Sequence, residues 1–141
     1  MTDVVLTADT LRYIALFEKI TRVRVRDCVD TPDKLVFIVG EGKARDAVGK
    51  KGEFVIKLKK LTGKDIQVIE FSDDPIKFLK SIFHTYGVKK VELENRGDIL
   101  HATVTVDPHE KAKAIGRAGK NLKIARDLAY RNFGIQSVSV A

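Results

Sequence analysis

The sequence has little of what builds disulfide scaffolds, membrane spans or secretory leaders. Cys28 is the single cysteine, so no disulfide can form within the chain, as is typical of proteins from a reducing compartment. No run approaches the ~20 consecutive apolar residues that cross a membrane. The N-terminal "MTDVVLTADT" has neither the basic start nor the apolar stretch of a signal peptide. We therefore expect a cytoplasmic protein without a membrane partner.

Patterns that carry catalysis or bind metals are also missing. We find no nucleophile–base arrangement, no Walker loop and no dinucleotide fingerprint. His84, His101 and His109 lack the spacing of zinc ligands, and only one cysteine accompanies them. No aromatic-rich strand of the K-G-F-x-F type occurs, which argues against base stacking of the RRM kind. We expect no enzyme activity, no metal and no cofactor.

Positive charge is abundant and unevenly placed. The 141 residues carry a formal net charge of +7, and 44% of them are hydrophobic, which is enough for compact cores. Residues 43–60 hold seven Lys and Arg against two acids, a net +5, and residues 110–127 hold six against two, a net +4. The remainder of the chain is therefore slightly acidic. Clustering of this kind indicates an anionic partner more strongly than the total charge does.

Both basic segments surround a pair of glycines with the pattern G-x-x-G. "AVGKKGEFVIKL" (residues 47–58) and "AIGRAGKNLKIA" (residues 114–125) match at the glycines and at the apolar positions around them. Glycine inside a helix costs roughly 1 kcal/mol relative to alanine, so a repeated pair needs a reason. An internal repeat of this length indicates two copies of one small domain, which we place at residues 1–72 and 73–141.

Each half predicts the same order of elements, α-β-β-α-α-β. The predicted elements of the first half are a helix over 9–20, strands over 22–26 and 34–40, a short helix ending at 48, a helix over 53–61 closed by Gly63, and a strand over 65–71. Arg22, Arg24 and Arg26 alternate with Val23 and Val25 in the first strand. We interpret these arginines as the solvated face of a half-buried strand, with a second phosphate track as the alternative.

The second half repeats this order with clear helix-start signals. Its predicted elements are a helix over 75–86, strands over 89–95 and 99–106, a short helix from 107, a long helix ending near 133 and a strand over 135–140. Asp74 is expected to cap the first helix, with Pro75 at the first helical position. Asp107 and Glu110 are expected to form a capping box.

A G-x-x-G elbow between two helices can hold phosphate. Glycines permit close approach of another backbone, and the helix that follows presents unpaired N–H groups and a partial positive charge. Val48 and Ile115 would line an apolar groove for bases. The candidate RNA-binding residues are Val48, Gly49, Lys50, Lys51, Gly52 and Lys57 in the first copy, and Ile115, Gly116, Arg117, Ala118, Gly119, Lys120, Asn121 and Lys123 in the second.

The motif I-G-x-x-G-x-x-Φ between two helices resembles the signature of the KH domain. A helix and a strand before that motif are similar to the type II KH arrangement, and two copies almost without a linker resemble the KH pair of the NusA family, its archaeal members most of all. The resemblance implies an α+β fold of two tandem type II KH domains, each with a three-stranded sheet and helices packed on one face. It also implies binding of extended single-stranded RNA across both loops, in transcription termination or antitermination.

Other functions remain open at this point. The polymerase-binding and S1 domains of bacterial NusA do not fit into 141 residues, so direct contact with RNA polymerase or the elongation complex is an open question. A ribosome-associated or RNA-processing factor is one alternative, and single-stranded DNA is an alternative ligand. A protein-interaction module on a KH fold is another, although both copies retain basic loop positions.

Overall fold

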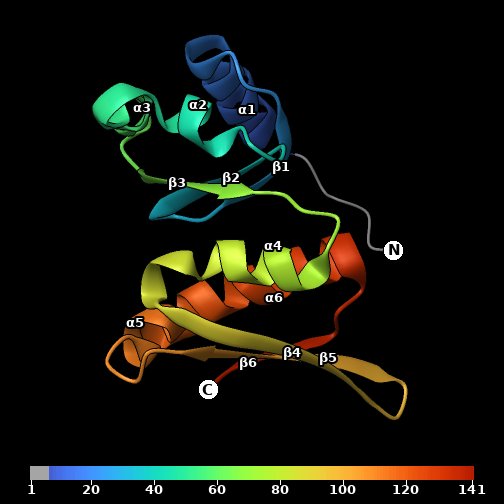
Figure 1. The fold of residues 1–141 in the computed structure, drawn as a ribbon. Coiled ribbons are helices and arrows are strands. Elements are labelled where there is room, and N and C mark those ends of the chain that lie inside the picture. The colour runs from blue at the N-terminus through green and yellow to red at the C-terminus, as the bar shows by residue number, and fades with distance from the viewer. Residues whose placement is uncertain (1–6) are drawn as a thin grey trace. The chain divides into compact units, whose positions relative to one another are not determined.

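A computed structural model describes residues 7–141, whose internal contacts divide them into two compact units, residues 7–72 and 73–141 (Figure 1). Residues 1–6, the start of the first predicted domain, lie outside the described residues. Each unit holds one three-stranded sheet together with its helices, so the α+β class is confirmed.

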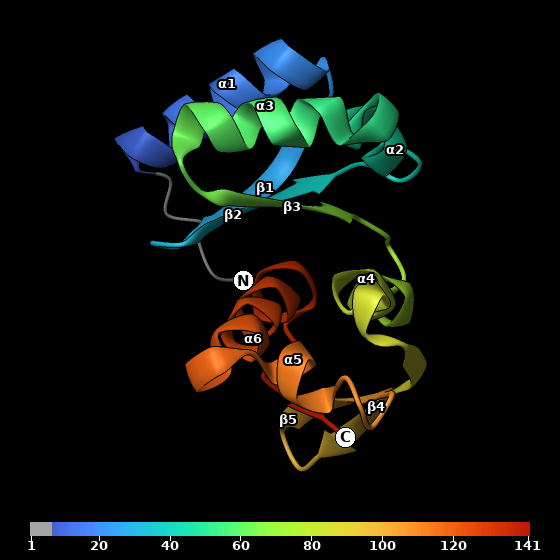
Figure 2. The same ribbon diagram turned by 90° about the vertical axis from the view of Figure 1, so that its left-hand side faces the viewer.

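In the first unit three helices lie on one face of a mixed sheet (Figures 1 and 2). Its elements are α1 (Ala8–Thr21), β1 (Val25–Asp30), β2 (Lys34–Val39), α2 (Ala44–Val48), a 3₁₀ turn (Lys50–Gly52), α3 (Glu53–Thr62) and β3 (Asp65–Glu70). The central strand β2 pairs antiparallel with β1 and parallel with β3. A central strand has neighbours on both sides, and β2 is accordingly a nearly continuous apolar run.

The second unit repeats this topology. Its elements are α4 (Pro75–Ile82), a 3₁₀ turn (His84–Tyr86), β4 (Val88–Arg96), β5 (Ile99–Val106), α5 (Lys111–Ile115), a 3₁₀ turn (Arg117–Gly119), α6 (Lys120–Phe133) and β6 (Ser137–Val140). β5 is central, antiparallel to β4 and parallel to β6. The order α-β-β-α-α-β is thus confirmed in both halves, with 3₁₀ turns added at the elbows.

Each unit has an aromatic contact in its interior. In the first, Phe17 of α1 stacks on Phe37 of β2 with ring centroids 4.2 Å apart. In the second, Phe78 of α4 meets Phe133 of α6 at 5.5 Å. Aromatic pairs at such distances contribute about 0.5–1.5 kcal/mol beyond the area that they bury. These contacts tie the first helix of each unit to the elements that follow it.

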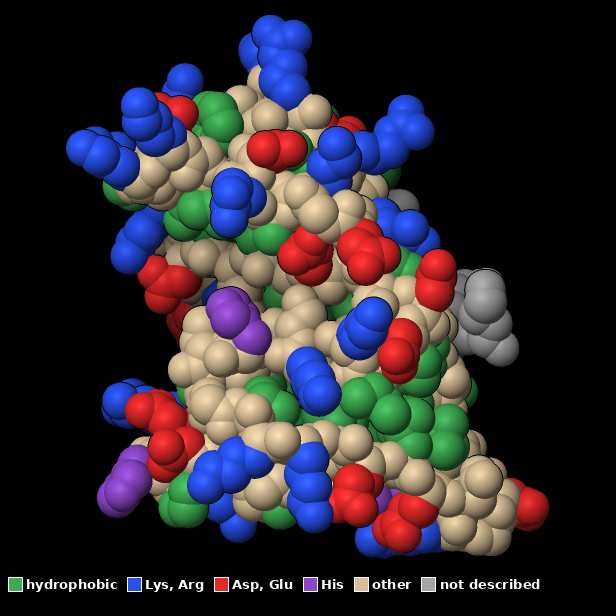
Figure 3. All heavy atoms as spheres, in the orientation of Figure 1, with side chains coloured by type: hydrophobic (Ala, Val, Ile, Leu, Met, Phe, Trp, Pro, Cys, Tyr) green, Lys and Arg blue, Asp and Glu red, His purple; other side chains and the backbone are tan. Residues whose placement is uncertain are grey.

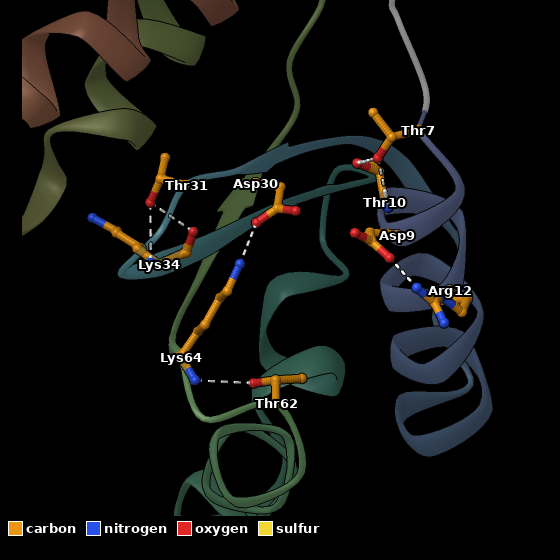
Figure 4. Close-up of polar contacts among 9 residues, drawn as sticks. All are labelled: Thr7, Asp9, Thr10, Arg12, Asp30, Thr31, Lys34, Thr62 and Lys64. Carbon is orange, nitrogen blue, oxygen red and sulfur yellow. Dashed lines mark hydrogen bonds and ion pairs between the residues drawn. The ribbon is translucent and has the colours of Figure 1, made fainter.

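Polar contacts close the ends of the first unit's elements (Figure 4). Thr7 caps α1 by accepting a hydrogen bond from the N–H of Thr10 at 3.1 Å. The ammonium of Lys64, just after α3, donates to the carboxylate of Asp30 at the end of β1 at 2.6 Å. This hydrogen bond raises the pKa of Lys64 above its usual range. Since a raised pKa favours the charged form in the folded state, the contact stabilises the fold until the pH rises through that pKa.

The predicted strand over 22–26 is wrong in its position. Arg22 adopts the left-handed conformation (φ 62°, ψ 20°), and its N–H donates to the carbonyl of Glu18 at 2.9 Å, which ends α1. The carboxylate of Glu18 then accepts the N–H of Val25 at 2.8 Å. The strand therefore begins at Val25, and of the three arginines only Arg26 lies in it.

The predicted capping box is also wrong, whereas the cap at Asp74 is confirmed. Asp74 accepts the N–H of Ile76 at 2.9 Å. The N–H of Asp107, which Glu110 was expected to bond, instead donates to the carbonyl of Gly87 at 2.9 Å. Asp107 closes a turn before the helix, and α5 begins at Lys111.

Candidate nucleic-acid interface

The two G-x-x-G loops have almost the same backbone conformation. Gly49 and Gly116 have φ/ψ of 81°/172° and 82°/164°, and Gly52 and Gly119 have 73°/18° and 72°/18°. The third residues of the loops, Lys51 and Ala118, are left-handed at 55°/27° and 57°/25°. Non-glycine residues seldom adopt this conformation, and it is found disproportionately often at functional sites. Two different sequences therefore form the same strained turn.

The first glycine of each loop packs against the helix that follows. A Cβ on Gly49 would lie 2.6 Å from the ring of Phe54, and a Cβ on Gly116 would lie 2.9 Å from the backbone nitrogen of Asn121. These distances are shorter than side-chain carbons tolerate. The close approach expected of these two glycines is thus made by the chain itself.

The second glycine of each loop faces open space. A Cβ at Gly52 or Gly119 would meet no atom within 4 Å. Each of these glycines is also the N-cap of the next helix and offers no side-chain hydrogen bond to its first turn. By contrast, α1 and α4 are capped by Thr7 and Asp74. The first-turn N–H groups of α3 and α6 therefore have no side-chain cap, as a phosphate-binding helix start requires.

Basic side chains surround both loops, and all of the predicted cationic site residues are exposed. They are Lys50, Lys51, Lys57, Arg117, Lys120 and Lys123. Lys and Arg side chains gather over α3 at the upper left of Figure 3. Val48 and Ile115, the last residues of α2 and α5, are half-buried. The predicted residues of each copy run from the end of the short helix, through the loop, into the helix that follows.

Asn121 has its amide group engaged within the chain. The side-chain NH₂ donates to the carbonyl of Lys113 at 3.0 Å and to the hydroxyl of Tyr86 at 3.1 Å. Both donors of the amide are therefore used, and they join α6 to α5 and to the turn after α4. Asn121 positions the second loop. Phe54 holds the corresponding place in the first loop, where its ring packs against Gly49.

Two neighbouring depressions lie in the first unit, and one of them reaches the first loop. One, of about 520 Å³, is lined by Thr21, Arg45, Asp46, Gly49, Lys50 and Phe54. The other, of about 630 Å³, is lined by Thr21, Arg22, Val23, Arg24, Arg26, Gly40, Lys43 and Asp46. The three alternating arginines line the second depression and are exposed, as expected of a solvated face, although only Arg26 lies in a strand.

Other chemistries find little support among residues 7–141. No three His, Cys, Asp or Glu side chains in this range come together as a metal site would need. Buried His101 has its ring nitrogens 2.8 Å and 3.1 Å from the hydroxyls of Ser137 and Ser139, so it joins β5 to β6. Every helix in the described range is too short or too polar to cross a bilayer.

The chain is similar to a family of transcription proteins over nearly its whole length. Residues 75–141 match the family described as the NusA-like second KH domain. Over 140 residues the chain is 36% identical to the probable transcription termination protein NusA of Thermoplasma acidophilum, covering 99% of this chain and 97% of that protein. The corresponding protein of Halococcus morrhuae is 32% identical, with 98% and 99% covered. The crystal structure of APE1850 superimposes with a TM-score of 0.78 at 32% identity, covering 96% and 99% of the two chains.

Residues 75–141 therefore form a KH domain of the NusA-like type. The chain as a whole belongs to the family of NusA-like transcription termination proteins. Its relatives are named for transcription termination, which is not an enzyme class.

Proposed function

We propose that the chain consists of two tandem type II KH domains, residues 1–72 and 73–141, which bind single-stranded RNA in extended form over both G-x-x-G loops. The observation that carries this proposal is the repeated loop conformation, in which an open glycine, an uncapped helix start and exposed cations meet at each elbow. A solvated helix–helix turn would need neither the strained third residue nor the same geometry in both copies.

Phosphate groups are the natural ligand of such an elbow. The uncapped N–H groups donate to phosphate oxygens, and exposed Lys50, Lys51, Arg117 and Lys120 add full positive charge beside them. Bases would lie beside Val48 and Ile115. The two loops together should neutralise about four to six phosphates. The logarithm of the binding constant should therefore fall with the logarithm of the salt concentration at a slope of roughly −3 to −4.

The biological role that we infer is transcription termination or antitermination, through the nascent RNA. The support is the name of the relatives that the chain matches nearly end to end. We propose no catalytic role. Contact with RNA polymerase is a separate question, which co-purification with polymerase or with ribosomal particles would answer.

Acidic substitution in the loops tests RNA binding. Arg117→Asp with Ala118→Asp, and Lys50→Asp with Lys51→Asp, place negative charge where phosphate would sit. Asp tolerates the left-handed conformation better than most residues, so both variants should stay folded. We expect each pair to reduce affinity for a single-stranded RNA of about twelve nucleotides by tenfold or more, measured by fluorescence anisotropy.

The matched control is Lys77→Glu with Lys80→Glu on α4, which changes the net charge by a similar amount at residues that belong to neither loop. We expect it to bind nearly as the native protein does. Native-like RNA affinity in both folded loop variants would contradict the proposal. Equal affinity for the matched single-stranded DNA would leave the loops as the site but remove the preference for RNA.

A further inference from the structure

The first unit has a basic groove outside its G-x-x-G loop. We call the 630 Å³ depression the arginine groove. Its charged lining residues are one acid, Asp46, and four cations, Arg22, Arg24, Arg26 and Lys43. Among the described residues no carboxylate forms an ion pair with Arg22, Arg24 or Lys43. A concave surface lined by unpaired cations attracts an anion.

The groove is continuous with the first loop. Thr21 and Asp46 line both the arginine groove and the depression that reaches Gly49 and Lys50. Because the two depressions share lining residues, an extended strand held at the loop would reach the groove next. This continuity favours the same nucleic-acid strand over an unrelated small anion.

Two of the arginines are held in place by the fold. The guanidinium of Arg26 lies 3.9 Å from the ring centroid of Phe71. Arg22 sits in the strained left-handed turn at the end of α1. The described residues contain only three non-glycine residues with positive φ, namely Arg22 and the two loop residues Lys51 and Ala118. The non-glycine residues with this unfavourable backbone conformation therefore lie at the two loops and at this groove. Such residues are found disproportionately often at binding sites.

The second unit has residues of different charge at three of the corresponding positions. Arg24 directly precedes β1, whereas Gly87 directly precedes β4. Gly40 follows β2, whereas Asp107 follows β5. Lys43 is the N-cap of α2, whereas Glu110 is the N-cap of α5. The basic residues Arg24 and Lys43 are therefore not repeated in the second copy.

We propose that the arginine groove binds backbone phosphates of the same RNA strand beyond the nucleotides held at the first loop, so that the first copy contacts a longer stretch of RNA than the second. Arginine suits this task because its planar guanidinium can donate two parallel hydrogen bonds to one phosphate. The proposal rests on the proposed function, since it takes the RNA at the first loop as given.

The test uses the full chain with Arg22→Asn, Arg24→Gln and Lys43→Gln combined. Asn tolerates the left-handed conformation, and Arg26 is left in place because it packs on Phe71. We expect affinity for a twelve-nucleotide single-stranded RNA to fall about tenfold, and the salt slope to become shallower by about 2, since each lost phosphate contact removes roughly 0.7. A short RNA of about four nucleotides, the length that one such loop clamps, should bind the variant and the native protein with equal affinity.

Three controls separate the outcomes. The matched control removes the same charge from the second unit by combining Lys77→Gln, Lys80→Gln and Lys89→Gln. An equal loss of RNA affinity in this control would overturn the proposal. The proposal would also be overturned if the salt slope of the groove variant equalled that of the native protein. The same holds if the variant lost as much affinity for the four-nucleotide RNA as for the twelve-nucleotide RNA. An oligoglutamate peptide is the second probe. If the groove variant binds RNA normally but no longer binds this peptide, the proposal fails and the groove is a site for an acidic protein. If Lys50→Asp with Lys51→Asp binds RNA normally, the proposed function fails at the first loop, whatever the groove shows.

Discussion

The two glycines of each loop differ in what they contribute. Gly49 and Gly116 combine a φ/ψ region that only glycine occupies readily with contact against their own following helix. Gly52 and Gly119 are left-handed but border open space. The first glycine therefore serves the elbow, and the second leaves room beside the helix start for a ligand.

This difference predicts unequal costs of a methyl group. Gly116→Ala is expected to lower the free energy of unfolding by about 2–3 kcal/mol, because it adds backbone strain and a Cβ 2.9 Å from the backbone nitrogen of Asn121. Gly119→Ala should cost only about 1 kcal/mol, from the left-handed conformation alone. Urea denaturation of both variants measures this, with Gly119→Asn as a milder control. Equal losses at the two positions would contradict the packing argument.

At the scale of elements, the helices begin in two different ways. α1 and α4, the first helix of each unit, have side-chain caps at Thr7 and Asp74. α3 and α6 begin at Gly52 and Gly119 without one. A side-chain cap is worth about 1 kcal/mol over alanine but only a few tenths over glycine. Glycine at the N-cap therefore leaves the helix start open at little cost, at the place where RNA is proposed to bind.

The cap on α4 provides a direct test of this comparison. Asp74→Ala should lower the free energy of unfolding by about 1 kcal/mol, since it removes the acceptor of the Ile76 N–H while Pro75 keeps the first helical turn in place. The exposed neighbour Asp73→Ala is the matched control for charge and should change stability little. Chemical denaturation at neutral pH distinguishes the two variants. A loss as large in Asp73→Ala would show that the charge, and not the hydrogen bond, matters.

At the scale of the whole molecule, each unit has its own sheet and buried side chains. The family match covers the second unit alone, while the relatives match the chain nearly end to end. We therefore predict that residues 73–141, produced separately, fold and unfold cooperatively, as measured by circular dichroism during thermal denaturation. A molten or unfolded fragment would show that this unit depends on the rest of the chain.

Joining the two units should increase RNA affinity beyond that of either alone. Once one loop holds the strand, the other meets it at a high effective concentration, so the intact chain should bind a twelve-nucleotide RNA about a hundredfold or more tighter than residues 73–141. Anisotropy titrations of both proteins at one salt concentration measure this. Equal affinities would mean that a single copy carries the binding.

Local patterns were enough to predict most of the architecture. Strict alternation over residues 99–106 gave β5 with its observed bounds, Asp74 and Pro75 gave the start of α4, and the repeated glycines gave both elbows. These features depend on backbone conformation and on neighbours a few residues away, so a single sequence contains the information. The same holds for the grouping of basic residues around the loops.

Contacts between distant residues decided the rest. β1 starts at Val25 because the carboxylate of Glu18 takes its N–H, and the capping box fails because Gly87 takes the N–H of Asp107. Packing also filled the space beside the first glycines and placed Arg22 and Arg24 around a cavity and not along a strand. Each of these outcomes depends on which partner a donor or a side chain meets after the chain has folded back on itself, and residue spacing does not encode that choice.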